Sequence, residues 1–192
     1  MKKSLLLFAV VLVAVATVGC AKEKKWGEKE RRELRNEVRA YRDMVYLDNL
    51  ADVEFDTFSG DVVEAVEVDY PIYTTFYELP ARGDTLEVYV VSTIVERLDA
   101  DAHNLRNIYP YPWLVAEGVL PAGLNHQAQR AFYDCLSHKI KRHYRTNNRF
   151  VDAVMNDPSS ADVIGNMQME CAADLFDWGV VVEETVEITP TN

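Results

Sequence analysis

The spacing of apolar residues changes several times along the chain, and each change predicts a different element. Between residues 28 and 45, Leu34, Val38, Tyr41 and Val45 recur at helical spacing within an otherwise charged segment. This narrow apolar stripe predicts an exposed helix that contacts the rest of the protein along one side. We expect its first turns to form a charged tether and its later turns to dock on a domain.

The middle of the chain has the patterns of strands. Apolar residues alternate with polar residues or proline across residues 66–72, which favours a strand with one buried face. Residues 72–78 and 85–97 are rich in β-branched and aromatic side chains, and the turn-forming residues 80–84 separate them, which predicts a hairpin. Alternation across residues 180–188 predicts a closing strand near the C-terminus.

Helical patterns occupy most of the segment between these strands. The longest covers residues 125–145, with a broad apolar face. That face consists of Ala128, Ala131, Phe132, Cys135, Leu136 and Ile140. A short helix is predicted over residues 150–155, and a final helix follows Ser159 and Asp162, which have the spacing of a capping box.

Together these elements predict an α+β fold with one domain. A small, mostly antiparallel sheet would pack against two or three helices, preceded by the N-terminal tethering helix. The closing strand would pair with the hairpin, because an isolated two-stranded hairpin is marginally stable in water. The domain is assigned to residues 46–192 and the tether to residues 20–45.

The first 20 residues have a pattern of their own. Lys2 and Lys3 precede an unbroken apolar run over residues 5–18, and Gly19 and Cys20 close it. A positive start, a short apolar stretch and a small-residue ending are typical of an export signal. A membrane-spanning helix needs about 20 apolar residues, so this run is short for one.

The Gly-Cys ending resembles the lipobox of bacterial lipoproteins. The resemblance implies that residues 1–19 are a signal peptide and that Cys20 carries a lipid anchor. It also implies that the protein lies in the bacterial cell envelope, attached to the lipid bilayer. Ala21 replaces the aspartate typical of inner-membrane retention, which favours the outer membrane. Residues 14–16 offer an alternative cleavage site of the ordinary A-x-A type, which would release a soluble protein.

The charge balance narrows the classes of partner. The chain has 31 acidic and 20 basic residues, and its net charge is −11 at pH 7. Nucleic-acid binding requires clustered positive charge, so this balance argues against a nucleic-acid partner. Ten acidic residues and no basic residue lie between positions 43 and 81. No calcium-loop motif occurs among them, which favours a solvated acidic face over a metal site.

Cys135 and Cys171 remain if Cys20 is acylated. Both lie on apolar faces of predicted helices, and an exported protein can keep a disulfide. Two buried free thiols are an equally good interpretation, since the sequence does not give the distance between them.

Asp99, Asp101 and His103 alternate after the predicted hairpin. In an extended segment their side chains would share one face and could hold a metal ion. In a helical segment Asp99 would cap the helix and Asp101 would favour its positive start. The helical interpretation is preferred, because Leu105 and Ile108 follow at helical spacing.

An aromatic and proline-rich run covers residues 109–113. The side chains of Tyr109, Tyr111 and Trp113 could form a platform for a sugar or peptide, with the prolines keeping the backbone extended. The structural alternative, which we favour, is a rigid connector whose rings cover the core.

The end of the long predicted helix is basic. Lys139, Arg142 and Arg145 lie there, with no acidic residue between Asp134 and Asp152. These cations would complement the negative end of the helix dipole. The alternative is a site for a phosphate or another anionic group.

The sequence therefore predicts a membrane-anchored envelope lipoprotein, with an accessory or interaction role that requires no catalysis. An envelope protein would be its partner, and neither a cofactor nor a metal is expected. One alternative is a binding module for a small glycan, peptide or anionic ligand. The other is a metal-dependent hydrolase using Asp99, Asp101 and His103, which is less favoured because the chain has none of the common catalytic motifs.

Overall fold

The computed structural model describes residues 23–179, of which 73% are helical. The chain begins with α2 (Glu28–Val38), the short 3-10 helix η1 (Arg39–Tyr41) and α3 (Asp52–Asp69). It continues with α4 (Tyr73–Tyr77), α5 (Arg82–Ala100), the 3-10 helix η2 (Ala102–Asn107) and α6 (Tyr111–Ala116). The last helices are α7 (His126–Tyr144), α8 (Asn147–Asn156) and α9 (Ser160–Phe176).

The prediction of an α+β fold with an antiparallel sheet is wrong, because no strand or sheet occurs in residues 23–179. The predicted strand over residues 66–72 begins inside α3. Phe55, Phe58, Val62 and Val66 are all buried, at the spacing of one helix face, whereas Val68 is 74% exposed. The alternating residues that suggested a strand begin in the last turn of this helix, whose buried face continues the helical spacing.

The predicted hairpin is also helical, as α4 and α5. Leu86, Val90, Ile94 and Leu98 are buried at intervals of four residues, so this segment buries one face of a helix, α5, in the core. Strand propensity is weak compared with the burial of a continuous apolar face, which decides the structure here. Gly83 and Asp84 lie in the first turn of α5 instead of in a hairpin turn. The predicted closing strand over residues 180–188 lies outside the described residues.

The helical predictions in the second half of the chain agree better with the structure. The long helix is α7, and α8 and α9 follow it. The predicted capping box at Ser159 is wrong: its hydroxyl donates to Asp157 Oδ1 at 2.7 Å, and it caps no backbone group of α9. Asp157 accepts from both the hydroxyl and the backbone N–H of Ser159 and so stabilises the turn before the helix.

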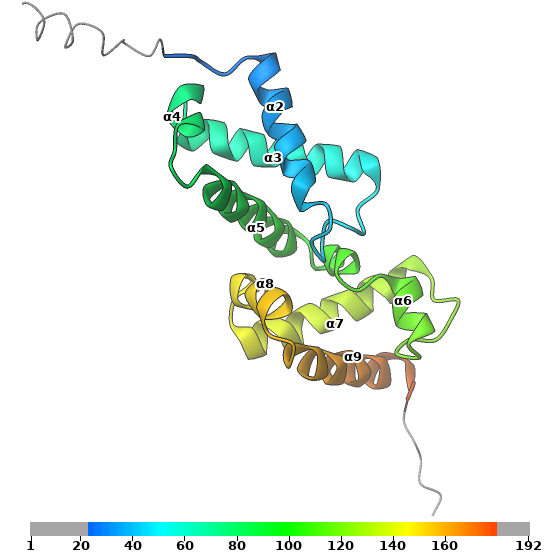
Figure 1. The fold of residues 1–192 in the computed structure, drawn as a ribbon. Coiled ribbons are helices and arrows are strands. Elements are labelled where there is room, and N and C mark those ends of the chain that lie inside the picture. Colours follow the sequence, from blue (N-terminus) through cyan, green and yellow to red (C-terminus); the bar gives the residue numbers. More distant parts are fainter. Residues whose placement is uncertain (1–22, 180–192) are drawn as a thin grey trace, which may run out of the picture.

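The helices form two groups that share one hydrophobic core. Figure 1 shows α2, α3, α4 and α5 in one half of the molecule and α6, α7, α8 and α9 in the other. The two halves meet where α5 packs against α8 and where η2 packs against α7. Along residues 23–179, no helix has both the length and the apolar character needed to cross a membrane.

The segment before α3 packs against the domain from Trp26 onward. The indole of Trp26 is 9% exposed and donates to the Tyr70 carbonyl oxygen at 2.6 Å. Arg31 of α2 forms a two-pronged hydrogen bond with Glu67 of α3, at 2.7 and 2.8 Å. The N-terminal helix is therefore fixed to α3 by both apolar burial and charge.

Arginines from elsewhere in the chain balance part of the acidic block of residues 43–81. Five of its carboxylates lie within 4 Å of an arginine side chain from outside the block. The pairs are Glu67 with Arg31, Asp56 with Arg39, Asp52 with Arg42, Asp61 with Arg97 and Glu54 with Arg106. These arginines come from α2, η1 and the residue after it, α5 and η2, so the pairs link α3 to the segments around it.

Candidate functional site

A groove between α5 and α8 is the surface feature best suited to hold a partner. Its volume is about 720 Å³, and its apolar lining comes from Val88, Val91 and Val95 of α5 and Met155 of α8. Val91 and Val95 are half-buried, whereas Val88 is 67% and Met155 37% exposed. Exposed apolar side chains along a groove mark an interaction site more often than scattered ones do.

The rim of this groove is acidic. Asp84 and Glu87 project from the first turns of α5, Asp152 lies on α8, and Arg149 is the single cation among the lining residues. Within the part of the chain that the structure describes, neither Asp84 nor Glu87 forms an ion pair. Three carboxylates against one guanidinium leave the groove with a net charge of −2, which favours a cationic occupant.

Hydrogen bonds at the start of α8 fix the position of the groove wall. The Thr146 hydroxyl accepts from the Arg149 N–H and caps the helix, while Phe150 and Val151 are buried in the core. Asn147 is 4% exposed, and its side-chain amide donates to Asp99 Oδ1 at 2.9 Å. Asp99 at the end of α5 therefore ties the start of α8 to α5.

Asp101 caps η2, whereas Asp99, the predicted cap, lies in the last turn of α5. Asp101 accepts from the His103 N–H at 2.9 Å and caps η2, which also holds the pKa of Asp101 below its usual range. Its other carboxylate oxygen lies 3.2 Å from Arg130. In residues 23–179, no three His, Cys, Asp or Glu side chains are placed together to hold a metal ion.

The aromatic run does not form an extended platform, because α6 begins at Tyr111. The Tyr111 hydroxyl donates to the Pro121 carbonyl and accepts from the Leu124 N–H, both at 2.9 Å, so it closes the loop after α6. Tyr109 is partly buried, and its ring lies 6.2 Å from the ring of Trp113. Only Trp113, at 46%, is substantially exposed. Most of this run has the structural role of a connector.

Two of the three predicted basic residues at the end of α7, Lys139 and Arg142, line one hollow, and Arg145 is not among its lining residues. The Lys139 amino group lies 2.7 Å from Glu170 and 3.6 Å from Asp174 of α9, and the bond to Glu170 raises the pKa of Lys139. Arg142 is exposed on a shallow hollow shared with Glu170. Arg145 follows the last residue of α7 with a positive φ of 71°. Acidic side chains of α9 therefore compete with any anion for Lys139.

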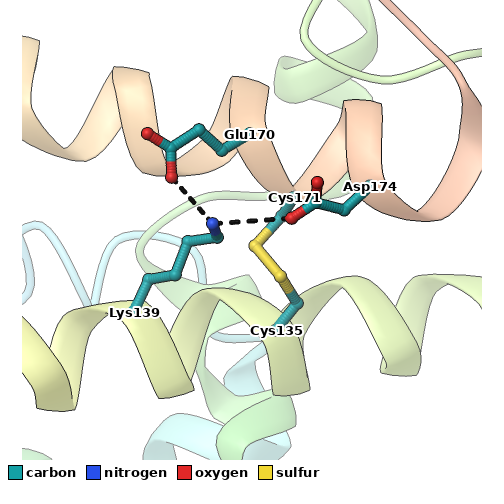
Figure 2. Close-up of a disulfide and its surroundings, with 5 residues drawn as sticks. All are labelled: Cys135, Lys139, Glu170, Cys171 and Asp174. Carbon is teal, nitrogen blue, oxygen red and sulfur yellow. Dashed lines mark hydrogen bonds and ion pairs between the residues drawn. A yellow bond between two sulfur atoms is a disulfide. The ribbon is translucent and has the colours of Figure 1, made fainter.

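The structure joins Cys135 of α7 and Cys171 of α9 by a disulfide, with an S–S distance of 2.03 Å. Figure 2 shows Lys139, Glu170 and Asp174 beside it, so a covalent bond and an ion-pair cluster cross the same interface. The sequence left open a disulfide or two free thiols, and the structure has the disulfide.

Sequence reasoning missed the groove because it treated residues 85–97 as a strand. In a helix, Asp84, Val88, Val91 and Val95 recur at three- or four-residue spacing on one face, and that period was visible in the sequence. The contribution of α8 to the groove could be recognised only from the tertiary structure.

Cys20, the predicted lipidation site, lies outside the described residues.

Comparison with protein-family models, curated proteins and solved structures finds no match for this chain.

Proposed function

We propose that this chain is a lipid-anchored lipoprotein of the bacterial envelope that binds a basic, amphipathic helix of a partner protein. The α5–α8 groove, with its apolar lining and acidic rim, is the observation that carries the proposal. The role is one of binding, as an accessory or interaction protein, and needs no catalytic group.

The shape and chemistry of the groove support a helical occupant. Two helices, α5 and α8, form its walls, and apolar side chains lie between them. An amphipathic helix can place its apolar face in such a groove, with anchor residues at i, i+3, i+4 and i+7. Lysine or arginine residues flanking that face would meet Asp84, Glu87 and Asp152 at the rim.

Two features support the envelope location. The apolar run that ends at Gly19 and Cys20 resembles the signal and lipobox of bacterial lipoproteins. The Cys135–Cys171 disulfide suits an exported protein, because disulfides persist in the oxidising periplasm and are rare in the cytosol.

The anchor is tested by cell fractionation of Cys20→Ala in the producing bacterium. We expect the wild-type protein in the membrane fraction and the variant in the soluble fraction. Incorporation of labelled palmitate should be lost in the same variant. Unchanged membrane association and labelling would contradict acylation at Cys20.

The groove is tested by site-specific photo-crosslinking in intact cells. A photo-reactive amino acid is placed at Val88, at Met155, or at Val53, a control on α3 that is 79% exposed and lies away from the groove. We expect Val88 and Met155 to capture the same protein and Val53 not to capture it. The double change Asp84→Lys and Glu87→Lys should abolish that product. Equal capture from Val53, or capture that survives the charge reversal, would contradict the proposal.

A further inference from the structure

A second hollow lies between η2, α6 and α7, and it is separate from the α5–α8 groove. Its volume is about 420 Å³, which lies in the range of sites for small molecules. The hollow brings together two segments that the sequence singled out independently, the one with His103 and the one with Tyr111. Its lining comprises Asn49, Glu54, His103, Arg106, Asn107, Pro110, Tyr111, Pro112, His126, Gln129 and Tyr133.

His103 lines this hollow, and its side chain has an unused polar atom. Its Nδ1 is buried and has no hydrogen-bond partner among the described residues. The centroid of its ring lies 5.4 Å from that of the Tyr133 ring, in a T-shaped arrangement. A buried polar atom without a partner is costly, and a ligand oxygen could provide that partner. Burial and the nearby Arg106 and Arg130 lower the pKa of His103, which favours the neutral ring.

Arg106 supplies a charged group with hydrogen-bonding capacity to spare. Its guanidinium donates to Glu54 Oε1 at 2.8 Å through one of its five N–H groups, and its side chain is 41% exposed. The planar fork of arginine suits the two oxygens of a carboxylate. The bond to Glu54 offsets the negative charge of that residue, so Glu54 does not dominate the hollow.

Part of the remaining lining is apolar, because the tyrosine hydroxyls in it are already bonded. The Tyr133 hydroxyl donates to the Tyr109 carbonyl at 2.8 Å, and that of Tyr111 is used in the loop after α6. Their rings and those of Pro110 and Pro112 therefore form an apolar surface beside Arg106. Such a surface suits the ring or branched body of a small ligand.

We propose that this hollow binds a small organic carboxylate, with its carboxylate between Arg106 and His103 and its apolar body against the proline and tyrosine rings. The hollow requires neither the lipid anchor nor the groove partner. Its test is therefore independent of the proposed function.

The test uses purified protein with benzoate, isobutyrate and inorganic phosphate as probes, followed by NMR of the histidine and arginine side chains. We expect saturable shifts at His103 and Arg106 with at least one carboxylate, and a higher pKa of His103 in the complex, because a bound anion favours the imidazolium. Arg106→Met should weaken binding by about tenfold or more, the equivalent of one charged hydrogen bond. Arg149→Met, which removes the same charge from the α5–α8 groove, should leave it unchanged.

Arg106→Lys keeps the charge but loses the fork, so it should also weaken binding if the variant remains folded by circular dichroism. Three results would overturn the inference: no saturable shift with either carboxylate, binding of phosphate alone, or equal loss of affinity in Arg149→Met.

Discussion

Cys135 and Cys171 join two helices whose contact has few large apolar side chains on one side. Among the buried residues of α9, Ile164 is the only large aliphatic one, and the others are Ser160, Gln168, Cys171 and Ala172. The disulfide, reinforced by Lys139 with Glu170 and Asp174, therefore compensates for a thin apolar interface.

We expect Cys135→Ser with Cys171→Ser to lower the free energy of unfolding by about 4 kcal/mol, because the bridge closes a loop of 36 residues in the unfolded chain. Chemical denaturation with and without reductant measures this difference. Lys139→Met is the matched control in the same interface. Its partner Glu170 is largely exposed, so its loss should cost about 1 kcal/mol or less. Equal stability of the reduced and oxidised proteins would contradict this role of the disulfide.

Trp26 should make the largest tryptophan contribution to stability. Trp26→Ala removes a buried ring and its hydrogen bond to Tyr70, and we expect a loss of about 3 to 5 kcal/mol. Trp113→Ala is the control, since its side chain is 46% exposed and should cost far less. Thermal and denaturant unfolding of both variants compares them. Similar losses would show that the segment before α2 is not fixed to the domain as described.

Stability should fall in alkaline solution. Burial, with Glu33 nearby, raises the pKa of Tyr73 from 10.0 to about 12, and burial also raises the pKa values of Tyr109 and Tyr133. Because the unfolded chain ionises first, this contribution is fully present below pH 10 and is lost as the pH rises toward 12. Phenolate absorbance near 295 nm, in native protein and in denaturant, measures the two titrations. Coincident curves would contradict the burial of these tyrosines.

Asp99→Ala should affect both stability and the groove. Asn147 would lose its acceptor while remaining buried, at a cost of about 1 to 3 kcal/mol. The start of α8 would also be released from α5, so binding of a partner in the groove should weaken. Asp162→Ala, on the exposed first turn of α9, is the control. An effect on neither property would show that the Asp99–Asn147 bond does not position α8.

The second half of the fold could be predicted from residues such as Phe132, Leu136 and Ile140, whose period is unbroken over α7. The error in the first half came from valine and threonine. Their strand preference in residues 85–97 hid the four-residue period of Leu86, Val90 and Ile94.

The candidate sites depended on distance in space more than on local pattern. The capping role of Asp101 follows from its own neighbours, although the sequence pattern favours Asp99 as the cap. The pairing of Asp99 with Asn147, and the contact of His103 with Tyr133, depend on how α5, η2, α7 and α8 pack. No local spacing records those contacts.

Binding of a basic helix in the α5–α8 groove is tested most directly by the affinity of the purified protein for a labelled amphipathic helical peptide of leucine and lysine, measured by fluorescence anisotropy. Val88→Asp and Met155→Asp should each weaken binding by about tenfold or more, because a carboxylate would be buried against the apolar face of the peptide. Val53→Asp should bind as the wild type does, and a peptide with the same composition in scrambled order should bind poorly. Equal affinity of all three variants, or equal binding of the scrambled peptide, would contradict the assignment of the α5–α8 groove.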